Sequence, residues 1–268
     1  MQAVRDWDLY AGVPLGALIE RRSLRQIDFA PARPALIRRA VGQAPAGSAD
    51  MERIGTPAKG LPALEWLLWQ APLKLATPEC AYAVQVAADI DREATQLQRD
   101  ADAAAAREAT PEEATAAFAE LLNQWVGSSE RLRWADLDKP RREAASRGEK
   151  DTPPAWPRAL SGQTSAAWAA HWQALARLAA MAGSAAPAPG AVLVTLEAYL
   201  RGRGLIALAD RWAARVAATG AAVDAIDPAR PATLDQAVRE LTQTKRLAED
   251  EVAAALDVRM GFSDADGD

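Results

Sequence analysis

The chain has 268 residues, of which half are apolar and a quarter are charged, and its formal net charge is −5. This length allows a substantial hydrophobic core, in one large or two ordinary domains. The acidic balance argues against nucleic-acid binding, which needs a concentrated basic surface. A single cysteine excludes an internal disulfide. No apolar stretch in the sequence reaches the roughly 20 residues of a membrane-spanning helix.

The composition favours helices. Alanine dominates the apolar residues, and it has the highest helix propensity, whereas β-branched runs are short. The nine tryptophans stand beside only three phenylalanines and three tyrosines. Because tryptophan is large and apolar, we expect several of these residues to anchor the packing between helices.

In the first half of the chain, residues 34–41 read as a short helix, and two longer helices have clear starts. Thr77 and Thr110 each precede a proline and acidic residues, which is the pattern of an N-cap followed by a first helical turn. After Thr77, apolar residues with helical spacing form one face: Ala83, Val86, Ile90, Ala94 and Leu97. We place Asp89, Asp91, Arg92 and Glu93 outside this face. The helix after Thr110 is expected to end at residues 127–129.

The second half contains a polar stretch followed by three predicted helices. Charges and four prolines between residues 139 and 157 predict a linker or an exposed excursion. Helices are expected over residues 164–181 and 191–219, and a capping box of Thr233 and Gln236 opens the last one. The sequence therefore predicts an all-α fold of two packed helical bundles. We assign residues 1–147 to the first bundle, 148–157 to a linker and 158–268 to the second.

The segment GLPALEWLLW, residues 60–69, places a carboxylate in an otherwise apolar helix start. Pro62 suits the first turn, because its missing N–H costs no hydrogen bond there. Glu65 lies among leucines and tryptophans and needs a cation, a hydrogen-bond donor or a proton, since desolvating a bare charge is costly. Two roles are open for Glu65: support of the first helical turn, which this chemistry favours, or binding and catalysis.

This segment and several others resemble the imelysin family of bacterial cell-envelope proteins. That family carries a GxHxxE motif at the start of a helix that continues with an aromatic residue and leucines, and here Gly60, Pro62 and Glu65 occupy the motif positions. Four further segments occur in the family's order: residues 22–34 upstream of the motif, and residues 161–164, 200–205 and 261–268 after it. The resemblance covers nearly the whole chain and implies an imelysin-like pair of helical bundles.

Two features depart from the family pattern. Pro62 stands at the position of the motif histidine, as in a branch of imelysin-like proteins, and proline has no metal-ligand atom. The start of the sequence also lacks the positive residues and apolar run of a signal peptide. A further helix that precedes residues 7–15 in the family is missing as well. We therefore expect the N-terminal bundle to lack its first helix and to expose an apolar strip.

His171 is the only histidine, so a catalytic zinc site would lack its usual ligands. A structural role is expected for His171. An oxygen-rich site for iron or calcium stays open, because hard cations accept shells of carboxylate oxygens. We predict no cofactor, and an iron, zinc or calcium ion is the disfavoured alternative.

In the expected pair of helical bundles, the cleft between them is the natural binding site. The ligand-binding candidates are Glu65 and Lys59, followed by Arg25, Asp28 and Arg33. The family is named after an insulin-cleaving metallopeptidase, and its members are associated with bacterial iron acquisition. The resemblance therefore implies a periplasmic or outer-membrane-anchored protein that binds a ligand or an envelope protein in an iron-uptake setting. The missing histidine argues against enzymatic activity.

Two other functions stay open. One is an imelysin-type metallopeptidase, which the absence of a histidine at position 62 opposes. The other is a structural interaction module that works through a tryptophan-rich surface. A Glu65 that is buried and paired, with no cleft beside it, would favour this interaction module.

Overall fold

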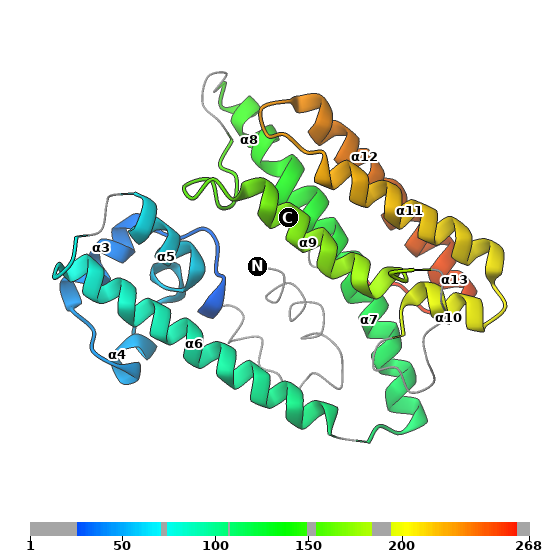
Figure 1. The fold of residues 1–268 in the computed structure, drawn as a ribbon, viewed down its shortest axis with the longest axis horizontal. Coiled ribbons are helices and arrows are strands. Elements are labelled where there is room, and N and C mark those ends of the chain that lie inside the picture. Colours follow the sequence, from blue (N-terminus) through cyan, green and yellow to red (C-terminus); the bar gives the residue numbers. More distant parts are fainter. Residues whose placement is uncertain (1–25, 71–73, 107, 149–153, 184–193, 262–268) are drawn as a thin grey trace. The chain divides into compact units, whose positions relative to one another are not determined.

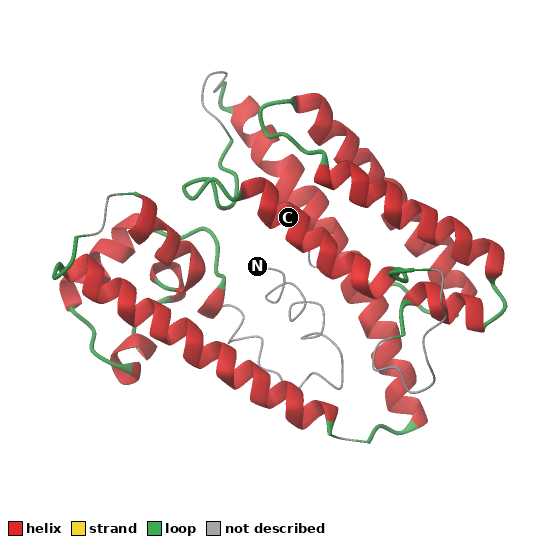
Figure 2. Cartoon of the chain, viewed as in Figure 1, coloured by secondary structure: helices red, strands yellow, loops and turns green. Residues whose placement is uncertain are grey.

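The computed structural model describes residues 26–70, 74–106, 108–148, 154–183 and 194–261 (Figure 1). Within these ranges all regular elements are helices and none is a strand, which confirms the predicted all-α fold (Figure 2). None of the described helices is both long and apolar enough to cross a membrane. The expected loss of a first helix concerns residues 1–25, which lie outside the described residues.

The described residues form two compact units, each built from separate stretches of the chain. The unit that we name the N-terminal unit contains described residues from 26–114 and the short segment 157–164. The C-terminal unit contains described residues from 115–156 and 165–261. The bundle limits 1–147 and 158–268, with a linker at 148–157, remain a prediction.

The N-terminal unit packs short helices against one long helix (Figure 1). Its elements are α3 (Pro34–Gln43), α4 (Ser48–Glu52), the 3-10 helix η2 (Thr56–Ala58), α5 (Gly60–Trp69) and α6 (Pro78–Ala105). The start of α6 is the predicted one, because the Thr77 hydroxyl accepts a hydrogen bond from the Cys80 N–H at 3.3 Å. The core of this unit consists of apolar side chains from all five elements, among them Ile37, Met51, Ala58, Leu67 and Val86.

The C-terminal unit is a larger helical assembly in which α11 and α12 lie side by side (Figure 1). Its elements are α7 (Pro111–Arg131), the π-helix η3 (Leu132–Asp138), α8 (Lys139–Ser146), α9 (Thr164–Ala179), α10 (Leu196–Gly202), α11 (Ile206–Asp224), α12 (Pro231–Leu247), the π-helix η4 (Ala248–Val252) and α13 (Ala253–Ala255). Thr110 and Glu113 cap the start of α7 reciprocally, at 2.9 and 3.2 Å. The predicted N-cap of this helix is thereby confirmed.

Tryptophans anchor the core of the C-terminal unit, as expected from their number. The rings of Trp125 and Trp212 lie 5.1 Å apart, and those of Trp156 and Trp168 are separated by the same distance. The indole N–H of Trp212 donates to a main-chain carbonyl at 2.8 Å, and that of Trp125 does so at 2.9 Å. Each of these two rings therefore buries its apolar surface without leaving its polar atom unpaired.

Two expected helix limits are wrong. Helix α7 continues through residues 127–129, because Ser128 and Ser129 are buried by tertiary packing that outweighs their low helix propensity. The helix expected over 191–219 is interrupted after Gly202. There the N–H of Leu205 bonds the Leu200 carbonyl at 3.0 Å, and that of Gly204, at φ +78°, bonds the Arg201 carbonyl at 2.9 Å. This is a Schellman ending, which needs glycine in the left-handed region.

The predicted capping box of α12 is also wrong. Arg230 is the N-cap and Pro231 is the first helical residue, so Thr233 already lies inside the first turn. The Thr233 hydroxyl accepts from the Asp227 N–H at 3.0 Å, while the Gln236 amide donates to Glu240 at 2.8 Å. Proline sets the start of this helix because its φ is already helical and its missing N–H needs no partner there.

Candidate functional site

Gly60 allows the backbone of residues 26 and 27 to pack closely against the start of α5. Its φ is +77°, and an added Cβ would lie 2.6 Å from the carbonyl oxygens of both Gln26 and Ile27. Any other residue would therefore meet both a strained backbone and a collision. The close contact holds residues 26 and 27 against the motif helix. It also places Asp28 next to that helix start.

Glu65 is the motif carboxylate, and its side chain is 11% exposed. One of its oxygens accepts two hydrogen bonds from Ser161, at 2.8 Å from the backbone N–H and at 2.6 Å from the hydroxyl. The other oxygen lies 3.8 Å from a guanidinium nitrogen of Arg158. Glu65 needs a partner because its surroundings are apolar. That partner is the segment around Arg158 and Ser161, nearly one hundred residues further along the chain.

Asp28 shares the same arginine. Its side chain is 7% exposed and forms an ion pair with the Arg158 guanidinium. Two of the five candidate residues, Asp28 and Glu65, are thereby brought together through a residue that carried no signal of its own in the sequence. The family-like Ser161 and Gly162, three and four residues after Arg158, were the available hint.

Lys59 precedes the motif and is enclosed. Its ammonium nitrogen lies 3.2 Å from an Asp89 carboxylate oxygen and donates to the Met51 carbonyl at 3.1 Å. The Lys59 and Asp89 side chains are only 1% and 2% exposed. The expectation that Asp89 lies outside the buried face of α6 is therefore wrong. A buried lysine between η2 and α5 compensates this acid, and sequence spacing within α6 could not reveal that partner.

Tyr82 completes this buried polar cluster. Its hydroxyl donates to the Ala58 carbonyl at 2.7 Å. Burial, together with the nearby Asp89 carboxylate, raises the pKa of Tyr82 well above its ordinary value. The hydroxyl therefore stays protonated and remains a donor. Lys59, Asp89 and Tyr82 together tie the segment before the motif to α6.

The last two candidates occupy different surroundings. Arg25 lies outside the described residues. Arg33 is the N-cap of α3, where its backbone N–H donates to the Pro57 carbonyl at 2.8 Å and its side chain is exposed. Among the described candidates, the structure thus groups Asp28 with Glu65, pairs Lys59 with Asp89 and leaves the Arg33 side chain on the surface.

The motif residues do not fit a metal ion. Pro62 offers no donor atom, and both Glu65 oxygens face hydrogen-bond donors or a cation. A metal ion between Asp28 and Glu65 would also meet the positive charge of Arg158. Across the described ranges, no three His, Cys, Asp or Glu side chains are grouped as metal ligands would be.

His171 lies in a separate buried network in the C-terminal unit. Its Nε2 lies 2.8 Å from the Ser128 hydroxyl, and its Nδ1 lies 3.3 Å from an Asp136 carboxylate oxygen. Ser128 and His171 are both buried, so a substrate cannot reach the hydroxyl. The network connects α7, η3 and α9, which gives His171 the structural role expected for it.

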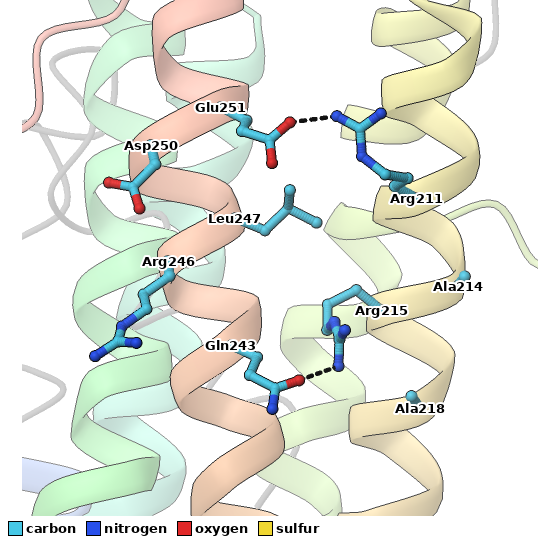
Figure 3. A pocket seen from close by; sticks show the side chains of 9 residues that line it. All are labelled: Arg211, Ala214, Arg215, Ala218, Gln243, Arg246, Leu247, Asp250 and Glu251. Atoms are coloured by element: carbon cyan, nitrogen blue, oxygen red, sulfur yellow. Dashed lines mark hydrogen bonds and ion pairs between the residues drawn. The ribbon is translucent and has the colours of Figure 1, made fainter.

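A groove of about 530 Å³ lies between α11 and the α12–η4 helix (Figure 3). It is lined by Arg211, Ala214, Arg215, Ala218, Gln243, Arg246, Leu247, Asp250 and Glu251. Arg211 pairs with Glu251, and Arg215 donates to Gln243 at 2.5 Å and to Glu240 at 2.8 Å. Side chains of α12 and η4 thus pair with Arg211 and Arg215, two of the arginines that line the groove. No sequence motif marked this groove.

Comparison with known proteins places the chain in a family. The imelysin family model (peptidase M75) matches residues 1–258. A solved imelysin-like protein from Psychrobacter arcticum 273-4 is similar in fold, with a TM-score of 0.69 and 16% sequence identity over 97% of this chain and 80% of that chain. No curated protein matches the sequence. The chain belongs to the imelysin family.

Proposed function

We propose that this chain is a non-enzymatic imelysin-family protein of the bacterial cell envelope that binds a ligand or protein partner in an iron-uptake setting. The observation that carries the proposal is the bonding of Glu65. A catalytic metal site keeps one coordination position open for water or substrate. Here Ser161 and Arg158 engage both carboxylate oxygens instead. Glu65 therefore serves to hold segment 157–164 on the motif helix.

The surface of the N-terminal unit supports binding of a protein. Seven large apolar side chains are exposed in the described part of the chain, and five of them belong to this unit: Leu68, Trp69, Leu75, Val84 and Leu160. Trp69, at the end of the motif helix, is 54% exposed. Exposed aromatic and aliphatic side chains are typical anchors of protein interfaces. This observation favours the structural interaction module as the second candidate function.

Metal titration by calorimetry tests the proposal against the metallopeptidase alternative. The full chain is titrated separately with Fe²⁺, Zn²⁺ and Ca²⁺ and is also assayed for peptidase activity on insulin. We expect no binding that depends on Glu65 and no cleavage, because its carboxylate is already paired.

The test variant is Glu65→Gln, and the matched control is Glu79→Gln, which alters an exposed acid of the same unit. Tight binding of any of the three ions that is lost in Glu65→Gln and kept in Glu79→Gln would contradict the proposal. So would insulin cleavage that disappears in Glu65→Gln alone.

A further inference from the structure

The Arg158 guanidinium is enclosed between two acidic side chains of the N-terminal unit. It pairs with Asp28 and lies 3.8 Å from a Glu65 oxygen. The three side chains are between 7% and 11% exposed, so water screens their charges only weakly. Two nearly buried carboxylates next to each other repel and need a cation. A guanidinium supplies that cation permanently, because it does not lose its proton in proteins.

The backbone at Arg158 is held in an unfavourable conformation. Its φ is +58°, in the left-handed region that residues other than glycine rarely adopt. Several bonds fix the segment around it. Ser161 is bonded to Glu65, the Gln163 N–H donates to the Arg158 carbonyl at 3.0 Å, and the Thr164 hydroxyl donates to the Pro157 carbonyl at 2.8 Å. Such a conformation persists only where its surroundings over-determine it, and this is common at sites with a role.

We infer that Arg158 is the built-in cation of the motif site and takes the place that a metal ion would otherwise fill between Asp28 and Glu65. The segment 157–164 carries this cation to the motif helix and closes the site to divalent ions. The inference shares with the proposed function the expectation that the wild type binds no divalent ion through Glu65, and it goes beyond it because it concerns the charge balance of the motif site whatever partner the protein binds. Partner binding and peptidase assays do not report on it.

Removing the guanidinium should convert the site into one that responds to cations. In Arg158→Met the long side chain and the backbone strain remain while the positive charge is lost. We expect thermal unfolding of this variant several degrees below wild type, and calcium chloride should raise its melting temperature. Calcium should leave the melting temperature of the wild type unchanged. The triple variant Asp28→Asn, Glu65→Gln, Arg158→Met should not respond to calcium.

Three further variants separate charge from packing. Arg92→Met removes an arginine from Asp89, which keeps Lys59, so it should gain no calcium response. Arg158→Lys keeps the positive charge and should stay insensitive to calcium. Asp28→Asn combined with Arg158→Met restores the original net charge and should melt above Arg158→Met. If Arg158→Met does not fold, the melting temperature of this double variant is measured with and without calcium and compared with that of Asp28→Asn alone.

Two results would overturn the inference. One is a wild-type protein that binds calcium, zinc or iron(II) in a Glu65-dependent manner. The other is a fall in the melting temperature of Arg158→Met that neither calcium nor the added Asp28→Asn substitution reverses. Arg158 would then act only through packing.

Discussion

Replacing Lys59 with methionine is expected to lower the free energy of unfolding by about 3 kcal/mol, because breaking a buried ion pair strands the remaining charge. Asp89 would lose the ammonium group that lies 3.2 Å from it, in surroundings almost closed to water. The Met51 carbonyl would lose its donor as well. This loss lies at the low end of the roughly 3–5 kcal/mol expected for breaking a buried ion pair. Asp89 keeps its second partner, Arg92, whose side chain is 41% exposed. Urea denaturation measures the loss.

A surface pair of the same unit provides the control. Arg53 pairs with Asp50, and the Arg53 side chain is 76% exposed, so Arg53→Met should cost less than about 1 kcal/mol. The double variant Lys59→Met, Asp89→Leu should recover most of the loss, since replacing both buried charges by apolar groups is often neutral. A Lys59→Met cost as small as that of Arg53→Met would show that water reaches the pair.

Replacing Gly60 with alanine is expected to cost about 3 kcal/mol, from left-handed backbone strain and from steric overlap. The added methyl group would lie 2.6 Å from two carbonyl oxygens of residues 26 and 27. Because those atoms belong to the backbone, the segment leading to Asp28 must shift. The substitution should therefore also weaken the contact between Asp28 and Arg158. Denaturant unfolding gives the cost.

Two other glycines of the same unit divide this effect into its parts. Gly162 has a φ of +69° but no neighbour within 4 Å, so Gly162→Ala reports the left-handed backbone strain alone, about 1 kcal/mol. Gly42 lies in α3 with open space around it, and Gly42→Ala should stabilise the protein by about 0.5–1 kcal/mol. A Gly60→Ala cost equal to that of Gly162→Ala would contradict the close approach of the two backbone carbonyls.

Local sequence signals determined the helical fold and several helix starts. A threonine, a proline and following acids specify the beginnings of α6 and α7, because these groups satisfy the unpaired N–H groups of a first turn. Local signals failed where tertiary packing decided. Ser128 continues α7 because its hydroxyl reaches His171, which lies on another helix. The chemistry of Ser128 alone predicts a helix end.

The motif site divides in the same way between sequence and structure. The sequence by itself determined that Glu65, in an apolar helix start, needs a partner, because an isolated buried charge is too costly. It also showed that Pro62 offers no ligand atom. Only the tertiary structure decided that the partners are Ser161 and Arg158, and that Asp28 shares the arginine. The physical reason is that the free-energy cost of burying a charge can be inferred from one residue and its neighbours in the sequence. The compensating charge, in contrast, can come from any segment that the fold brings near.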